Sequence, residues 1–487
     1  MRLPPLEHHP AQKQQKMTTE ALNDTICAIS TPPGVGGIAV ARISGPQAID
    51  IADSIWNGLP LAKAASHTAH LGIITDAQGR ELDQAVATVF RAPHSFTGDD
   101  VVELSVHGSR YVQRELIHTL ISHGARMATA GEFTRRAFAA GRMDLAEAEA
   151  VADVIASDSR AAHRIAMTQM RGGVSQRLAT LRERLVDLAA LLELELDFSE
   201  EDVEFADRTR LIDLAEQVHS EVERLYKSFR SGQAIKEGIP VAIVGATNAG
   251  KSSLLNALLD DDRAIVSDIH GTTRDTIEET MVIGDYRFRI IDTAGLRDTA
   301  DRIEQIGIER SRQAIAHARI VICVIDSTAP LPDGVLHEAA MPALQNDGYL
   351  IALLNKSDLH ADEATVSAAH AFAGHSDIAS GHIATIAVSA SLSQGIDSLR
   401  DSLVRMADCE NAASSDDILI TNARHAAALS AAAQSSQRAI EALRAQIPGD
   451  LIAQDIRETI HHLSSITGDI PSAEILTTIF SRFCIGK

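Results

Sequence analysis

The spacing of apolar residues changes along the chain, and each change marks a different kind of structure. Between Thr25 and about Ala140, short apolar runs alternate with segments that contain Gly and Pro. The runs are Ile38–Ile43, Gln84–Phe90 and Val101–Val106. This pattern is typical of strands joined by turns and predicts a small α+β domain.

From Asp144 the apolar residues recur at spacings of three and four, which predicts helices with one buried face. One run is Leu178, Leu181, Leu185, Leu188, Leu192 and Leu196, and the next is Leu211, Leu214, Val218, Val222, Leu225 and Phe229. The second helix is predicted to stop at Gly232. The acidic stretch Asp197–Asp207 between the two helices is expected to be a solvated loop, with metal binding as the alternative.

A third pattern begins near Ile239, where short apolar runs alternate with helical segments. The runs are Val241–Val244, Phe288–Ile291, Ile320–Ile325, Leu350–Leu354 and Ile383–Val388. They predict a parallel sheet with crossover helices. Helical patterns return at Asn422–Gln446 and Leu451–Ile466. The simplest interpretation is an α/β domain inserted into a helical domain whose halves, about 143–236 and 407–487, pack together.

Composition limits the possible classes of protein. A chain of 487 residues suggests about three domains, and no apolar run reaches the length of about 18 residues that spans a membrane. Residues 1–23 lack the apolar core of a secretory signal and are expected to form a disordered leader. The four cysteines, at positions 27, 323, 409 and 484, have neither disulfide-framework nor metal-site spacing. We therefore expect a cytoplasmic protein.

The net charge of -22 argues against a protein that wraps nucleic acid over much of its surface. Phosphate binding requires clustered Lys and Arg, and aromatic residues that could stack on single-stranded RNA make up only 3% of the chain. Any contact with RNA is therefore expected to be local or shared with a partner.

A glycine-rich segment follows the first strand of the α/β region and precedes a helix. It reads Gly245-Ala-Thr-Asn-Ala-Gly-Lys251-Ser252 and matches a P-loop. In such a loop backbone N–H groups turn toward phosphate oxygens, Lys251 reaches the β and γ phosphates, and the Ser252 hydroxyl binds Mg²⁺. An ordinary Gly-rich turn is the alternative unless other motifs agree.

Three further motifs agree, each at the carboxyl end of a predicted strand, where open α/β sheets bind ligands. Asp292-Thr293-Ala294-Gly295 offers a carboxylate that supports magnesium and an N–H that senses the γ phosphate. In Asn355-Lys356-Ser357-Asp358, the Asp358 carboxylate can accept two hydrogen bonds from guanine, and adenine lacks that pair of donors. Ser389-Ala390 ends the last strand. Together the motifs predict GTP binding and hydrolysis rather than ATP chemistry.

One position departs from Ras-type sites. Leu296 stands where a glutamine would orient the attacking water. The charged segment 297–310 offers four candidates for that role, and position alone does not choose among them. They are Asp298, Asp301, Glu304 and Glu309.

Outside the GTPase motifs, four blocks of sequence resemble the MnmE family of tRNA modification GTPases, also called TrmE, and the resemblance runs from Thr25 to Lys487. The blocks are Thr31–Ile38 with Arg42–Gly45, Ser95–Leu104, Gly131–Phe138 continuing to Asp144–Glu149, and the terminal Phe483-Cys-Ile-Gly-Lys487. The GTPase motifs alone would also fit a ribosome-assembly GTPase, but these blocks would not.

The resemblance implies a multidomain fold with a small α+β folate-binding domain, an α-helical domain and an inserted α/β P-loop GTPase domain. The implied segments are a leader at 1–23, a tetrahydrofolate-binding and dimerisation domain at 24–142, helical halves at 143–236 and 407–487, and the GTPase domain at 237–406. The implied assembly is a homodimer that joins the flavoprotein MnmG, as a heterotetramer, and acts on tRNA.

The activity implied is the addition of an aminomethyl or carboxymethylaminomethyl group to C5 of the wobble uridine of certain tRNAs. A 5-formyl- or 5,10-methylene-tetrahydrofolate would donate the carbon, and GTP, Mg²⁺ and K⁺ would be bound. A folate-binding scaffold whose GTP cycle only regulates MnmG is the alternative within the same resemblance.

Site residues follow from the resemblance position by position. The folate contacts would be Arg42, Glu103, Arg142 and Lys487, with Arg142 in place of the lysine expected in the family. Glu304 would orient water, Ser252 and Thr273 would bind Mg²⁺, and K⁺ would be held by Asn248, Ser267, Ile269 and Thr272. With the motifs above, the nucleotide contacts become Asn248, Ala249, Gly250, Lys251, Ser252, Ser253, Ser267, Gly271, Thr272, Thr273, Asp292, Thr293, Ala294, Gly295, Asn355, Lys356, Asp358, Ser389 and Ala390.

Cys484 lies in the terminal motif and invites a nucleophile hypothesis, because a thiolate can add to a uridine ring. No adjacent residue supplies an obvious base, and a lone thiol near a terminus more often packs. Packing is therefore the preferred interpretation, with catalysis as the alternative.

Overall fold

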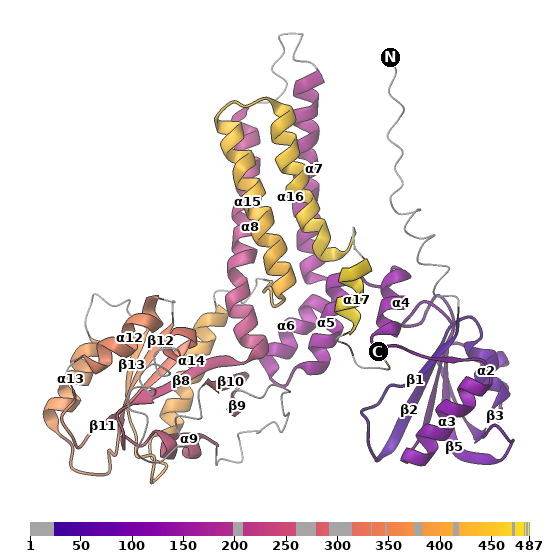
Figure 1. The fold of residues 1–487 in the computed structure, drawn as a ribbon, viewed down its shortest axis with the longest axis horizontal. Coiled ribbons are helices and arrows are strands. Elements are labelled where there is room, and N and C mark those ends of the chain that lie inside the picture. Colours follow the sequence, from indigo (N-terminus) through magenta and orange to yellow (C-terminus); the bar gives the residue numbers. More distant parts are fainter. Residues whose placement is uncertain are drawn as a thin grey trace. The chain divides into compact units, whose positions relative to one another are not determined.

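The computed structural model describes residues 24–197, 208–259, 279–291, 314–332, 334–345, 348–374, 382–412, 418–469, 473–481, 483 and 486. These residues form two compact units, each with its own sheet (Figure 1). The first contains the described residues up to Ala152, Met170–Arg182, and those from His461 onward. The second contains Asp153–Gln169 and the described residues of Glu183–Ile460.

The first unit is built on a seven-stranded sheet of order β3-β4-β5-β6-β2-β1-β7. Its strands pair antiparallel except β1 with β7. Figure 1 shows α2 (Ala48–Ser54) and α3 (Arg110–Ser122) beside the sheet. The strands are β1 (Ile26–Ile29), β2 (Gly36–Ser44), β3 (Trp56–Asn57), β4 (Thr68–Thr75), β5 (Glu81–Phe90), β6 (Val101–Gly108) and β7 (Arg126–Met127), with a short 3-10 helix η1 (Leu61–Lys63).

Buried and less buried side chains alternate along β6, which places polar side chains on one face of the sheet. Val102, Leu104 and Val106 are buried in the core that α2 and α3 complete. The side chains of a strand point to opposite faces in turn, so Glu103 lies on the face away from that core. Arg42 alternates with buried residues of β2 in the same way. One face of the sheet therefore forms the core, and the other carries polar groups.

The C-terminal part of the chain completes this unit. Phe480, in α17 (Ala473–Ser481), packs with Phe483 and with residues of α4 (Glu132–Ala139) and α5 (Leu145–Ala156). The contact is close, because a Cβ added to Gly131, whose φ is +65°, would lie 2.6 Å from the Phe480 carbonyl oxygen. Glycine is therefore required where α4 begins.

The second unit contains a six-stranded sheet of order β13-β12-β11-β8-β10-β9. All neighbouring pairs are parallel except β9 with β10, and β9 was not predicted from the apolar pattern. The strands are β8 (Ile239–Gly245), β9 (Glu279–Ile283), β10 (Tyr286–Ile291), β11 (Ile320–Asp326), β12 (Tyr349–Asn355) and β13 (Ile383–Ala387).

Both faces of this sheet are covered, as the continuous apolar runs require. Val241 and Ile243 pack in one core with α9 (Lys251–Leu259) and α14 (Ile396–Ala412). Ala242 and Val244 pack in a second core with α12 (Val335–Gln345), and α13 (Glu363–Ala373) lies on the same side. The predicted parallel sheet with crossover helices is confirmed.

Long helices precede and follow the strands of this sheet along the chain. They are α6 (Arg160–Met170), α7 (Gly173–Asp197), α8 (Arg208–Glu237), α15 (Ala423–Arg444) and α16 (Gly449–Thr467). Within the second unit α8 packs along α15, with Ser228 Oγ accepting from the Ile420 amide at 3.1 Å and Arg444 bound to Glu216 at 2.6 Å. The α/β segment is thus inserted between helices that pack together. No helix in the described ranges is long and apolar enough to cross a membrane.

The prediction that the second helix stops at Gly232 is wrong. Helix α8 continues through Gly232 to Glu237. A Cβ at position 232 would lie 2.2 Å from the Ile420 carbonyl oxygen. The glycine therefore permits a close approach between two segments and does not end the helix.

Candidate functional site

Four loops at the carboxyl ends of parallel strands meet at one edge of the second sheet. They follow β8, β11, β12 and β13, and hydrogen bonds join the loop after β12 to the ends of β11 and β13. Ser327 N donates to Asn355 O at 3.0 Å, and Ser357 N donates to Val388 O at 3.0 Å. This is the edge at which open α/β sheets bind their ligands.

The loop from Gly245 to Gly250 has the geometry of a P-loop. Gly245, Asn248 and Gly250 all have positive φ, at 146°, 65° and 97°, and α9 begins directly afterwards at Lys251. The Lys251 ammonium donates to the carbonyl oxygens of Gly245 and Ala246, each at 2.9 Å, and burial lowers its pKa. Among the described residues, its hydrogen-bond partners are these two carbonyls, and a desolvated cation of this kind is well suited to phosphate oxygens.

Asn355 holds two of these loops in place. Its side chain is buried, and Nδ2 donates to the Ala249 carbonyl at 2.7 Å while Oδ1 accepts from the Ala390 amide at 3.0 Å. A Cβ at Gly250 would lie 2.1 Å from Asn355 Nδ2, so only glycine at this position lets the loop approach the Asn355 side chain. The first residue of the Asn355–Asp358 motif therefore binds the P-loop to the loop after β13.

Lys356 is held by a residue that the sequence did not single out. Its Nζ lies 2.5 Å from Asp326 Oδ2, at the end of β11. Burial raises the pKa of Asp326, but hydrogen bonds from Lys356 and Thr328 outweigh it, and the pKa lies below its ordinary value. The sequence signal that could have identified Asp326 is an acidic residue at the end of a buried strand. The prediction ended that strand one residue earlier, at Ile325.

The residues predicted to contact the base differ in their exposure to solvent. Asp358 and Ser357 are exposed, whereas Ser389 is fully buried and bonds to Gln394 through both backbone groups, at 3.0 and 3.1 Å. Ser252 and Ser253 lie exposed in the first turn of α9. An exposed carboxylate above a rigid loop can accept hydrogen bonds from a ligand without first breaking a buried contact.

The remaining predicted residues of the nucleotide and metal sites lie outside the described residues. They are Ser267, Ile269, Gly271, Thr272, Thr273, Asp292, Thr293, Ala294, Gly295 and Glu304. Cys484 and Lys487 of the terminal motif also lie outside the described residues.

A second candidate site lies on the polar face of the first sheet. Arg42 and Glu103 are direct partners in the pairing of β2 with β6. Arg42 Nε and a terminal nitrogen both bind Glu103 Oε1, at 2.9 and 2.8 Å, so that Oε2 is not used by Arg42. The guanidinium lies 5.4 Å from the Phe96 ring centroid and 5.6 Å from that of Phe133. The pair is thus ordered against two aromatic rings, and no described residue donates a hydrogen bond to Oε2 of Glu103.

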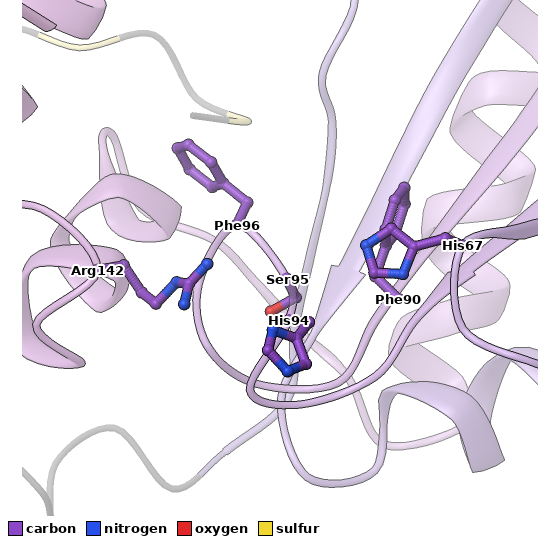
Figure 2. Close-up of a pocket in the computed structure, with 6 residues that line it drawn as sticks. All are labelled: His67, Phe90, His94, Ser95, Phe96 and Arg142. Atoms are coloured by element: carbon purple, nitrogen blue, oxygen red, sulfur yellow. The ribbon is translucent and has the colours of Figure 1, made fainter. Parts of the chain in front are cut away.

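Arg142, the third predicted folate contact, is positioned by the end of α4. Gly141 has a φ of +67°, its N–H bonds to the Phe138 carbonyl at 3.0 Å, and Arg142 N–H bonds to the Ala137 carbonyl at 2.9 Å. These two bonds form a Schellman motif, which fixes the direction of the chain after a helix. A Cβ at Gly98 would lie 3.6 Å from Arg142 Cγ, so the Ser95–Asp100 loop packs against this side chain. Figure 2 shows the Arg142 guanidinium extending toward the loop of Ser95 and Phe96. A cavity of about 350 Å³ opens here, and its lining residues are His67, Phe90, His94, Ser95, Phe96 and Arg142.

A buried ion network, not predicted from sequence, supports this region. Glu132 is bound by Arg126 at 2.7 Å, by Arg136 at 3.0 Å and by the Thr129 amide at 2.8 Å, and Arg136 also binds Asp24 at 2.6 Å. Burial would raise the pKa of Glu132, but these hydrogen bonds outweigh it and lower the pKa to about 2. The network joins the start of β1 to α4.

Gly486, in the terminal motif, lies against the end of the first strand. Ser30 Oγ donates to the Gly486 carbonyl at 3.0 Å, and a Cβ at Gly486 would lie 2.2 Å from the Ile29 carbonyl oxygen. Phe483 is buried with Leu145, Ala148 and Phe480. The last described residue therefore lies beside the β1 end that precedes Thr31-Pro-Pro-Gly34.

Two family models match the chain. The model of the MnmE helical domain matches residues 145–484, and the model of the N-terminus of the GTP-binding protein TrmE matches residues 25–142. The chain belongs to the MnmE family of tRNA modification GTPases. The resemblance seen in the sequence blocks is thereby confirmed.

Curated members of the MnmE family match nearly the whole chain. The protein named tRNA modification GTPase MnmE of Parabacteroides distasonis is 47% identical over 95% of this chain and 100% of its own length. The MnmE protein of Christiangramia forsetii is 45% identical over 96% of this chain and all of its own. Among solved structures, the G domain of the T. maritima iron transporter FeoB aligns with 35% of this chain and 98% of its own at 23% identity and a TM-score of 0.25, and the family assignment does not depend on it.

Proposed function

We propose that this chain is a potassium-dependent GTP hydrolase that works with the flavoprotein MnmG to modify C5 of the wobble uridine of certain tRNAs. GTP hydrolysis in tRNA modification is the activity of the family to which the chain belongs. The added group would be aminomethyl or carboxymethylaminomethyl, with its carbon from a 5-formyl- or 5,10-methylene-tetrahydrofolate. We infer a homodimer that acts in the cytoplasm.

The observation that carries the GTPase part is the double hydrogen bond of Asn355. It couples the loop that would hold phosphates to the loop that would hold the base, because one side chain binds both Ala249 and Ala390. Asp358 follows in the same rigid segment and would accept from guanine. A guanine nucleotide fits this arrangement, because it would present phosphates to one loop and its base to the other.

The metal ions would act on the same phosphates. Ser252, in the first turn of α9, would bind Mg²⁺ together with Thr273, with Asp292 in support. Asn248, exposed and with a φ of +65°, would help to hold K⁺ with Ser267, Ile269 and Thr272. Both cations, when bound, supply positive charge that stabilises the charge developing on the transferred phosphoryl group. Glu304 would orient the attacking water.

The folate part rests on the Arg42–Glu103 pair. Among the described residues, none donates a hydrogen bond to Glu103 Oε2, so this oxygen can accept from the amino-pyrimidine edge of a pterin, and cations can bind the ligand's carboxylates. We propose residues 24–142 as this folate-binding domain, residues 237–406 as the GTPase domain, and 143–236 with 407–487 as the helical domain. The segment 1–23 would be a leader.

Hydrolysis rates in matched potassium and sodium buffers test the GTPase proposal. Loss of charge stabilisation in a transition state typically costs about a hundredfold in rate, so GTP hydrolysis should be at least that much faster in K⁺. Glu304→Ala should depress kcat strongly with nearly unchanged nucleotide affinity, since Glu304 would act on water rather than on the nucleotide. Equal rates in the two salts would remove potassium from the mechanism, and a collapse of affinity would make Glu304 structural.

A further inference from the structure

A carboxylate and an ammonium meet where β11 and β12 end, next to the segment proposed to contact the guanine base. Asp326, the last residue of β11, is the register partner of Asn355, the last residue of β12. The ammonium of Lys356 lies 2.5 Å from Asp326 Oδ2. The two side chains are 33% and 23% exposed, and an ion pair this exposed adds little to the stability of a fold. Its main effect is therefore on the position of the lysine.

Both oxygens of the Asp326 carboxylate accept hydrogen bonds. Oδ1 accepts from the Thr328 amide at 3.0 Å and from the Thr328 hydroxyl at 2.6 Å, while Oδ2 accepts from Lys356. The loop that contains Thr328 is itself joined to the loop after β12, because Ser327 N donates to Asn355 O at 3.0 Å. The carboxylate is thus held in one orientation, with Oδ2 directed to the lysine.

The backbone of Lys356 is also fixed, in a conformation that side chains with a Cβ disfavour. Its φ is +63°. Ser357 N donates to Val388 O at 3.0 Å, and Leu359 N donates to Lys356 O at 3.0 Å. Backbone of this kind persists where its surroundings determine it, and it is concentrated at ligand sites. Because both ends of the side chain are fixed, its methylenes span from the loop after β12 to the end of β11.

A lysine side chain held at both ends offers an ordered apolar strip to a ligand. The methylenes of long charged side chains cover apolar surface while the charged group stays with its polar partner. A side chain that is already ordered loses little rotamer freedom when a ligand arrives, so binding is less opposed by entropy. Asp358, two residues further on, is exposed and would accept from the edge of the base. The methylenes of Lys356 would support the face of the same base.

We propose that Asp326 is a positioning residue for the guanine base, which holds the Lys356 side chain extended so that its methylenes support the face of the base beside Asp358. This inference rests on the guanine-nucleotide site of the proposed function and extends it to a residue outside the nucleotide-binding motifs. Asp326 acts through Lys356 and is assigned no contact with the nucleotide. Removing its charge therefore weakens binding only while the lysine side chain is present.

A double-mutant cycle in the full-length protein tests this role, with affinity measured by titration of fluorescent GDP. Asp326→Asn keeps the shape of the side chain and removes its charge, so affinity should fall about tenfold, while kcat at saturating GTP should match the wild type. In the Lys356→Ala background, Asp326→Asn should cause no further loss, because the side chain that it positions is gone. Thr328→Val, which removes one donor to Asp326, should cause a smaller loss that also disappears in that background.

The matched control is Glu223→Ala, which breaks a 2.8 Å pair with Lys227 on α8 and should leave GDP affinity unchanged. If the wild-type protein binds no guanine nucleotide, the proposed GTPase site fails and this inference fails with it. If the wild type binds GDP and Asp326→Asn binds it equally well, the site stands and the positioning role is wrong. A loss of the same size with and without the Lys356 side chain, or a lower kcat at saturating GTP, would show that Asp326 acts by another route and would overturn the inference.

Discussion

At each candidate site, one side-chain contact orders the motif beside a polar group that we propose binds the ligand. Asn355 fixes loop geometry through two buried hydrogen bonds, whereas Asp358, three residues later, is exposed and available to a base. Glu103 shares one oxygen with Arg42 and keeps the other. In both sites a structural contact orders the motif and leaves a neighbouring polar group for the ligand.

Changing Asp358→Asn should shift the nucleotide preference from guanine toward xanthine. The carboxylate accepts from two donors of guanine, whereas an amide offers one donor that suits the 2-oxo group of xanthine. Affinity for GTP should fall about tenfold or more, and affinity for xanthosine triphosphate should rise. Fluorescent-nucleotide titration measures both, with Glu363→Gln, an exposed carboxylate in α13, as the control. Unchanged GTP affinity in the Asp358 variant would show that another residue reads the base.

Glu132 should make stability depend on pH in the acid range. Its pKa is lowered from 4.5 to about 2, so the folded state favours the ionised form. The stabilisation is complete above pH 4.5 and is lost as pH falls through about 2, and it amounts to about 3 kcal/mol. Glu132→Gln should therefore lower the urea midpoint at pH 7, and the gap from wild type should narrow at pH 3. Glu81→Gln, exposed on β5, serves as the control; a gap of equal size at both pH values would contradict the assignment.

At the scale of elements, periodicity predicted most of the fold because burial repeats regularly. The runs at Val241–Val244 and Leu350–Leu354 became parallel strands covered on both faces. The apolar pattern could not predict features that depend on contacts between residues distant in sequence. Gly232 was predicted to end a helix, but glycine is needed there because the Ile420 carbonyl lies too close for a Cβ. Asp326 can bind Lys356 only because β11 and β12 pair in a register that brings their ends together.

The P-loop, Asn355–Asp358 and Arg42 with Glu103 were predicted from motifs or from family resemblance, and each folds into a definite local geometry. The cavity lining of His67, Phe90 and His94 had no sequence signal. These residues come together only through the turn before β4 and the loop after β5.

Helix α8 offers a test of the close-approach argument. Gly to Ala in a helix interior normally stabilises by about 1 kcal/mol, but at Gly232 the new Cβ would lie 2.2 Å from the Ile420 carbonyl oxygen. Overpacking typically costs about 1–3 kcal/mol, so Gly232→Ala should lower the urea midpoint. Ser220→Ala, at an exposed position of the same helix, should leave it nearly unchanged. A raised midpoint in the Gly232 variant would mean that the two segments are not in close contact.

At the scale of the whole molecule, the end of β1 and the segment near Gly486 lie side by side although they are distant in sequence. Gly486 bonds to Ser30, and Phe483 packs beside α4 and α5. The P-loop belongs to the other compact unit. Folate binding and GTP hydrolysis should therefore respond differently to changes at the C-terminus.

Deleting Cys484–Lys487 should weaken tetrahydrofolate binding and abolish wobble modification, because the segment that bonds Ser30 is removed. Potassium-stimulated GTP hydrolysis should remain largely intact, since the hydrophobic cores around the second sheet contain no described residue beyond Leu419. Calorimetry with 5-formyl-tetrahydrofolate and a phosphate-release assay measure the two activities. Undiminished folate affinity in the truncated protein would remove Lys487 from the folate site.

Mass analysis of wobble nucleosides in tRNA most directly tests whether the chain joins its GTPase to uridine modification. Cells that lack this chain should contain unmodified uridine at the wobble positions that carry aminomethyl- or carboxymethylaminomethyl-type nucleosides in the parent strain. Wild-type protein should restore the modification, whereas Lys251→Ala, which removes the ammonium from the P-loop, should not. A full set of modified wobble uridines in cells without this chain would contradict the proposed function.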